Sequence, residues 1–301
     1  MGDLGHLAGV TFRSRQIVYA REYCHGWICH LTKASGMKSQ PLVVIGAPRS
    51  GTTFLCHVLN QHPLIQLTNE SRIFVMIKDL VEERSFRPHL IGREFQDRFS
   101  GFIRRNAGEL VERFYRDALQ VTAPIWGDKH PPYADPAVLS GRKGSELRLP
   151  TSGSCLRLIQ SCLPTVKFIH IHRDPLEVAH SLLVKRWAES LADGVQVWRD
   201  YVSEIVEFLG EMEQARHLTI PYSDLLVRPE EVTRAIGHFL DLSDVGSLER
   251  FLLGQREGPT PFSDPVTDLA AAYRKRAPRP ANRHALALAG IAAERLGYGR
   301  C

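Results

Sequence analysis

The chain has 301 residues, of which 44% are hydrophobic and 24% charged, as is ordinary for a soluble globular protein. Its 38 basic residues exceed its 33 acidic residues by five, which favours local anion-binding positions over a nucleic-acid-binding surface. No run approaches about eighteen consecutive apolar residues, and the N-terminus lacks a basic segment followed by an apolar one, so we expect a cytoplasmic protein without a membrane span.

The first forty residues predict a helix rather than a metal site. Segment 24–30 contains two cysteines and two histidines, but no second pair of ligands follows at the spacing of a zinc finger. Apolar residues recur at helical spacing over residues 17–31, so we interpret the segment as part of an amphipathic helix and expect no metal. The sequence thus predicts a helical extension over residues 1–40 and one large domain over residues 41–301.

A buried strand, a tight loop and a helix follow each other at the start of this domain. The apolar run Leu42–Ile45 is typical of a central parallel strand that helices cover on both faces. Gly46, four further residues and Gly51 reproduce the spacing of a P-loop that binds nucleoside triphosphates, but Thr52 stands where such a loop has its lysine. Because that lysine neutralises the β- and γ-phosphates, its absence predicts an anion without a γ-phosphate.

The same loop offers other groups that bind anions. Arg49 supplies a planar guanidinium, and Ser50, Thr52 and Thr53 supply hydroxyl groups. The helix predicted over Thr52–Leu59 begins at the loop, so its free N–H groups and positive dipole end would face the bound anion. An ordinary strand-to-helix turn is the alternative, but such a turn needs neither the arginine nor two adjacent threonines.

The remainder of the chain alternates strands with helices. We expect strands around 64–67, 165–171 and 217–221. We expect helices up to about residue 79 and at 108–119, 193–210 and 229–240, another that begins at Pro175, and a last one that ends near 295–298. The segment 82–105 is predicted to be a charged, lid-like insertion, 124–133 a loop that follows a short strand, and 141–153 a surface loop. This alternation predicts an α/β fold with a parallel sheet flanked by helices on both faces.

A second candidate anion site lies where the strand at 165–171 meets the next helix. Arg173 and Ser181 are eight residues apart, slightly more than two helical turns, so both side chains could face one side and hold a second phosphate. The pair is weak evidence alone, because arginine often follows a strand and a helical serine is usually solvated. Together with the modified P-loop it becomes specific.

Gly46–Leu55 and Arg173–Ser181 together resemble the two signatures of sulfotransferases that use 3′-phosphoadenosine 5′-phosphosulfate (PAPS). In that family the first loop binds the 5′-phosphosulfate, and the arginine and serine bind the 3′-phosphate. The resemblance covers most of residues 40–242 and implies a P-loop-like sulfotransferase fold. It includes Tyr222–Glu230, similar to the family's Y-x-D-L-x-x-x-P-E segment, and implies that Tyr222 contacts the cofactor. Phe54, by its position in the first signature, would stack near the adenine, with core packing as the equal alternative.

The resemblance also implies the residues that carry the chemistry. Residues 62–72 are similar to the segment of tyrosylprotein and related sulfotransferases in which a glutamate after the second strand is the base, so Glu70 is the first candidate and Arg72 a candidate acceptor-binding residue. Alternatively, Glu70 could only interact with the positive end of the dipole of the following helix. Lys129 resembles the family lysine that reaches the leaving-group oxygen. His130 is the second candidate base, because histidine here directly follows the lysine, whereas small-molecule sulfotransferases have K-x-H-x-P.

These residues predict a transferase that moves a sulfuryl group from PAPS to a hydroxyl of a small molecule (a carbohydrate, lipid or specialised metabolite) by in-line displacement, releasing 3′-phosphoadenosine 5′-phosphate. Glu70 would take the acceptor proton, while Lys129 and Arg49 stabilise negative charge without a metal. A phosphotransferase with a degenerate P-loop and a non-catalytic nucleotide-binding protein are the alternatives. Thr52 argues against the first, and the presence of both Glu70 and Lys129 against the second. The family's C-terminal R-K-G-x-x-G segment has only poor counterparts, at 256–258 and 273–276.

Overall fold

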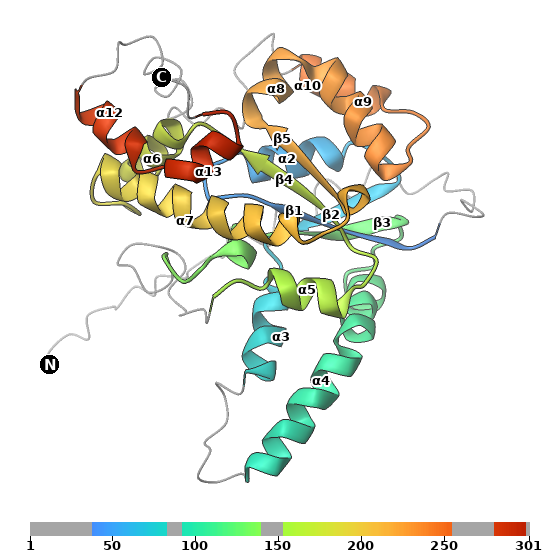
Figure 1. Cartoon of the computed structure of the whole chain (residues 1–301). Helices are drawn as coiled ribbons and strands as arrows, with labels where there is room; N and C mark the ends of the chain where they lie inside the picture. The colour runs from blue at the N-terminus through green and yellow to red at the C-terminus, as the bar shows by residue number, and fades with distance from the viewer. Residues whose placement is uncertain (1–37, 83–91, 140–152, 255–279, 299–301) are drawn as a thin grey trace, which may run out of the picture. The chain divides into compact units, whose positions relative to one another are not determined.

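Five parallel strands form a sheet with the order β2-β3-β1-β4-β5 (Figure 1). The strands are β1 (Gln40–Ile45), β2 (Ile65–Asn69), β3 (Ile125–Lys129), β4 (Lys167–His172) and β5 (His217–Pro221). The structure is a computed structural model that describes residues 38–82, 92–139, 153–254 and 280–298. The described residues from Ser39 onward belong to one compact unit. The helical extension predicted over residues 1–40, including the segment at 24–30, lies almost entirely outside the described residues and stays a prediction.

Helices cover both faces of the sheet, as predicted. They are α2 (Thr52–Leu59), α3 (Ile73–Val81), α4 (Arg93–Arg113), α5 (Leu156–Cys162), α6 (Pro175–Val184), α7 (Leu191–Gly210), α8 (Tyr222–Val227), α9 (Pro229–Leu240), α10 (Gly246–Gly254), α12 (Pro280–Ala287) and α13 (Gly290–Arg295), with the π-helical turn η1 (Phe114–Ala118) and the 3₁₀ turns η2 (Pro131–Ala134) and η3 (Gln214–Arg216). Helix α2 packs on β1, β2 and β3, and α9 on β5, while α6, α7, α12 and α13 pack together on the other face.

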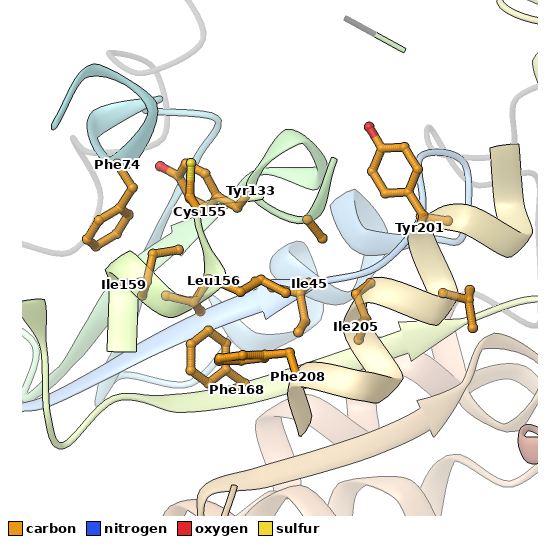
Figure 2. Packing of buried hydrophobic residues seen from close by; sticks show 14 of the residues in the cluster. Ile45, Phe74, Tyr133, Cys155, Leu156, Ile159, Phe168, Tyr201, Ile205 and Phe208 are labelled. Carbon is orange, nitrogen blue, oxygen red and sulfur yellow. The ribbon is translucent and has the colours of Figure 1, made fainter. Parts of the chain in front are cut away.

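Strand β1 is buried on both faces because it lies in the middle of the sheet. Its side chains alternate, and Val43 and Ile45 join the apolar cluster beneath α7 while Leu42 and Val44 point to the opposite face. Figure 2 shows this cluster, in which the rings of Phe168 and Phe208 meet edge to face with centroids 5.2 Å apart. The predicted strand at Leu42–Ile45 and the helix at Thr52–Leu59 are confirmed.

Strand β3 corrects one prediction. It occupies residues 125–129, inside the segment that the sequence analysis interpreted as a loop after a strand. Its last three residues include a glycine and two charged side chains, all buried, which hides the usual apolar signal. Gly127 has φ +154°, and a Cβ there would lie 1.9 Å from the carbonyl oxygen of Leu42, so only glycine allows β1 and β3 to pair here.

The charged, lid-like insertion predicted over residues 82–105 is described at residue 82 and from residue 92 onward. Residues 93–105 form the first part of helix α4, and most of them are exposed. Ala107 and Val111 are buried on one side of this helix, which packs against α3 and α5. The surface loop predicted at 141–153 lies, except for Gly153, outside the described residues. No helix among the described residues is long and apolar enough to cross a membrane.

Candidate active site

Most of the predicted site residues lie at or just beyond the carboxyl end of a strand, whereas Phe54 lies in helix α2 and Ser181 in helix α6. The loop 46–51 follows β1, Glu70 follows β2, Lys129 ends β3, Arg173 follows β4 and Tyr222 follows β5. Because the strands are parallel, these ends share one edge of the sheet. The connections after β1 and β4 leave in opposite directions, which creates the crevice where open α/β sheets bind ligands.

The loop after β1 has a backbone that depends on its glycine. Gly51 has φ +97°, and a Cβ on it would lie 2.3 Å from Cδ2 of Tyr222. Arg49 also adopts the left-handed region, with φ 72°. Helix α2 begins directly after Gly51 without a capping side chain, and its first turn contains no acidic residue that would compete with an anion for its N–H groups.

The hydroxyl groups of this loop fit an oxyanion. Ser50 is fully buried, and its Oγ has no hydrogen-bond partner within the described parts of the chain. Thr52 is buried and Thr53 half-buried in the first turn of α2. A buried hydroxyl without a protein partner is unusual in a folded protein, and a bound anion would satisfy it.

Arg49 joins the two predicted anion motifs. Its Nε donates a hydrogen bond to Oγ of Ser181 on helix α6, at 2.8 Å. The sequence analysis paired Ser181 with Arg173, and the structure adds the contact with the first loop. The two residues are 132 positions apart in sequence, so this contact shows that the two segments lie side by side in the fold.

Arg173 lies in a polar pocket. It is nearly buried, its Nε donates to Oε2 of Glu177 at 2.6 Å, and its guanidinium carbon lies 4.7 Å from the ring centroid of Tyr222. Burial lowers the pKa of Arg173, yet an arginine of this kind remains charged. Together with Asp174, Ser223 and Tyr298, Arg173 lines a cavity of about 190 Å³.

Tyr298 is a residue of this pocket that sequence reasoning missed. It follows α13 and is hydrogen-bonded to Nδ1 of His172, with 2.8 Å between the hydroxyl oxygen and the ring nitrogen. The poor counterparts of the family's C-terminal segment, at 256–258 and 273–276, lie outside the described residues. Tyr298 belongs to no recognisable motif, so only the fold could bring it to Arg173.

Glu70 and Lys129 form an ion pair at the same edge, with 2.7 Å between Oε1 and Nζ. The lysine side chain is fully buried, whereas the glutamate side chain is 46% exposed. A buried ammonium needs an anionic partner, and Glu70 provides one. The pair therefore presents an accessible carboxylate and a compact positive charge at one point of the crevice.

His130 follows Lys129 and is only 3% exposed. Burial lowers the pKa of His130 to about 3, and the charges of Lys129 and Arg72 act in the same direction. Neither ring nitrogen has a hydrogen-bond partner among the described residues. A histidine held neutral in this way accepts a proton poorly near pH 7, so the environment favours Glu70 as the base.

Two predicted contacts are less direct. Arg72 is half-buried at the N-terminus of α3, and its charge reaches His130. Phe54 is buried and lies beside Tyr222 and Phe251, at centroid distances of 6.1 and 6.4 Å. The two alternatives for Phe54, stacking near the adenine and core packing, both stay predictions.

The family model described as Sulfotransferase family matches residues 41–245. The protein-tyrosine sulfotransferase of Drosophila melanogaster is 24% identical over 215 residues, which are 68% of this chain and 39% of that protein. The part of each curated relative that aligns with this chain covers 39% to 66% of that relative. This chain therefore spans about half the length of the curated relatives that it matches.

Two solved structures have a similar fold. The sulfotransferase domain from the curacin biosynthetic pathway has a TM-score of 0.55 and 19% identity, covering 86% of this chain and 98% of that one. The sulfotransferase domain from the Synechococcus PCC 7002 olefin synthase has a TM-score of 0.57 and 19% identity, covering 90% and 100%. At this identity the likeness concerns the fold alone, and it is the fold that the sequence resemblance implied.

Proposed function

The chain belongs to the sulfotransferase family, and we propose that it transfers a sulfuryl group from PAPS to a hydroxyl group of an acceptor. One observation carries the proposal: the ion pair of Lys129 and Glu70 lies at the same sheet edge as a P-loop-like turn that lacks the Walker lysine. A lysine and a carboxylate at the reacting centre suit transfer to a hydroxyl, which needs a proton acceptor and a stabilising cation.

The residues at this edge fit a donor with two separate anionic groups. The loop after β1, with Arg49, Ser50 and the N-terminus of α2, would hold the 5′-phosphosulfate. Arg173 and Ser181 would hold the 3′-phosphate, and the hydrogen bond from Arg49 to Ser181 supports one binding site that includes both sets of residues. Bound PAPS would supply the sulfuryl group, and its leaving group would be 3′-phosphoadenosine 5′-phosphate, which is abbreviated 3′,5′-ADP below.

The chain's own residues divide the remaining work. The exposed carboxylate of Glu70 would accept the proton of the acceptor hydroxyl. The ammonium of Lys129 would stabilise the negative charge that develops on the departing phosphate oxygen. Since Lys129 is buried, solvent screens its charge weakly, and the stabilisation is larger than at the surface.

Two classes of acceptor fit this chemistry. A small molecule with a free hydroxyl is the class that the sequence analysis proposed. The phenol of a tyrosine in a peptide is the second candidate, favoured by the names of the sequence relatives and by the likeness of residues 62–72 to their segment. Both acceptors require the same proton acceptor at Glu70.

The test is a transfer assay with isotopically labelled PAPS and a panel containing 4-nitrophenol, simple sugars and alcohols, and tyrosine peptides. We expect label in at least one product and equimolar 3′,5′-ADP. Glu70→Gln should lower kcat by about 10²- to 10⁴-fold, the usual contribution of a general base. Glu109→Gln, which changes a glutamate on the exposed side of α4, is the matched control and should keep full activity.

Several outcomes would count against this function. Label that reaches no acceptor of either class, together with weak PAPS binding, rules out the proposed transfer. Full turnover by Glu70→Gln, with normal binding of 3′,5′-ADP, shows that another residue is the base. Label only in tyrosine peptides selects the second acceptor class, and label only in small molecules selects the first.

A further inference from the structure

A second carboxylate lies directly beside the site and has no role in the chemistry above. Asp128 precedes Lys129 in β3 and is fully buried. Its Oδ1 accepts hydrogen bonds from the hydroxyl of Thr68 at 2.7 Å and from the backbone N–H of Ser71 at 3.3 Å. Its Oδ2 accepts from the hydroxyls of Ser71 at 2.8 Å and Tyr133 at 2.6 Å.

These donors come from three different segments. Thr68 lies in β2 opposite Asp128, Ser71 in the turn between β2 and α3, and Tyr133 in η2. Successive side chains of a strand point to opposite faces, so Asp128 and Lys129 act on opposite sides of β3. Asp128 holds the turn after β2 from one face of the sheet, while Lys129 contacts Glu70.

The turn that Asp128 holds has an unfavourable backbone. Glu70 has φ 66° and Arg72 has φ 63°, so two of three consecutive residues adopt the left-handed region without being glycine or asparagine. Such a conformation persists only where the surroundings fix it. Ser71, between the two, is fixed to Asp128 by both its hydroxyl and its backbone N–H, and the N–H of Glu70 donates to the carbonyl of Lys129 at 2.8 Å.

We propose that Asp128 is the positioning residue of the base: by holding Ser71 it keeps the left-handed turn in which the carboxylate of Glu70 faces Lys129. The inference rests on the proposed role of Glu70. Asp128 acts through the turn, because its hydrogen bonds run to Thr68, Ser71 and Tyr133. Moving a carboxylate out of water costs free energy. The four hydrogen bonds that Asp128 accepts from Thr68, Ser71 and Tyr133 offset this cost and explain a buried aspartate in a strand.

The first test measures transfer from labelled PAPS to 4-nitrophenol, or to the tyrosine peptide if the panel selects it. Asp128→Asn keeps the shape but replaces one acceptor oxygen by a donor. We expect kcat to fall by about 10²-fold, because displacement of a reacting group by about 1 Å has an effect of that size. The Kd of 3′,5′-ADP should stay within about twofold, since the loop after β1 is untouched. Ser71→Ala, which removes one hydroxyl, should lower kcat by about tenfold in the same way.

A matched control separates positioning from general destabilisation. Asp135 is also fully buried and accepts hydrogen bonds from the backbone N–H groups of Val138 and Leu139. Asp135→Asn should therefore lower the unfolding free energy without a comparable loss of kcat. If Asp128→Asn does not fold, Ser71→Ala tests the inference alone, with its loss of about tenfold in kcat and an unchanged Kd of 3′,5′-ADP.

A double-variant cycle decides whether Asp128 acts through Glu70. In the Glu70→Gln background, Asp128→Asn should lower kcat by less than about threefold, because the group that it positions is already inactive. An undiminished loss in that background, a full kcat for Asp128→Asn alone, or an equal loss for Asp135→Asn would overturn the inference. An active Glu70→Gln instead defeats the assignment of the base, which is a separate result.

Discussion

Lys129 is the residue in which burial and charge are most tightly linked. Its ammonium is fully buried and 2.7 Å from a half-exposed carboxylate. Removing the carboxylate would leave a buried charge without its partner, whereas removing the lysine leaves Glu70 able to contact water. Removal of Glu70 should therefore destabilise the fold more than removal of Lys129, although both abolish the ion pair.

We predict that Lys129→Met lowers kcat by about 10²- to 10³-fold, the usual effect of losing one group that stabilises developing charge. Methionine retains the length and the apolar stem, so the unfolding free energy should change little. Steady-state kinetics with labelled PAPS and urea unfolding measure the two quantities. An unchanged kcat would show that Lys129 does not act on the leaving group.

The environment of His130 leads to a prediction about the pH dependence of kcat/KM. With a pKa of about 3, it stays neutral from pH 8 down to about pH 4, so it contributes no break near pH 6–7 to the profile of kcat/KM. His130→Gln should thus leave the shape of that profile unchanged, even if the absolute rate falls. A limb with a midpoint between about pH 6 and 7 that disappears in His130→Gln would make His130 the base.

The loop between β1 and α2 is the element that most restricts substitution. We predict that Gly51→Ala weakens binding of 3′,5′-ADP by at least about tenfold, because the new methyl group would strain the backbone and meet the ring of Tyr222. Gly210→Ala at the end of α7, where a Cβ has open space, is the matched control and should leave binding unchanged. Calorimetric titration measures both, and equal affinities would contradict the proposed role of the loop.

The sequence reveals elements whose pattern is local. The apolar run Leu42–Ile45, the glycine spacing and Pro175 are local signals, and the structure confirms the strand, the helix after the loop and the helix that begins at Pro175. Strand β3 and the contacts of Asp128 could not be found in this way. They bury polar side chains that a hydrophobic pattern excludes, and they depend on the register of Thr68 with Asp128. Tyr298 likewise reaches Arg173 only through the packing of the last helix.

At the scale of the molecule, buried histidines link stability to pH. Burial lowers the pKa of His130 to about 3 and that of His172 to about 4, well below the value of about 6.5 in an unfolded chain. The unfolded state therefore binds more protons as the pH falls below about 6.5. The stability that these residues contribute is complete above that pH and is lost progressively towards their folded-state pKa values.

We predict that the unfolding free energy falls by about 1.4 kcal/mol for each of these two histidines, about 3 kcal/mol in total, between about pH 7.5 and about pH 5.5. Urea unfolding at the two pH values measures the difference. Replacing His172 by glutamine should make the decrease smaller by about 1.4 kcal/mol, and His170, whose pKa burial also lowers, adds to what remains. A stability that is flat over this range would show that the two histidines are not held neutral in the folded protein.

The central claim is that the loop without a lysine and the pocket at Arg173 together bind a 3′-phosphorylated adenosine donor rather than a nucleoside triphosphate. Calorimetric titration of the whole chain with 3′,5′-ADP, 5′-AMP and ATP·Mg²⁺ tests it most directly. We predict the tightest binding for 3′,5′-ADP, and at least about tenfold weaker binding for 5′-AMP, which lacks the group that Arg173 and Ser181 would hold. ATP·Mg²⁺ should not displace 3′,5′-ADP. Binding of ATP·Mg²⁺ as tight as that of 3′,5′-ADP, or no difference between 3′,5′-ADP and 5′-AMP, would contradict the account.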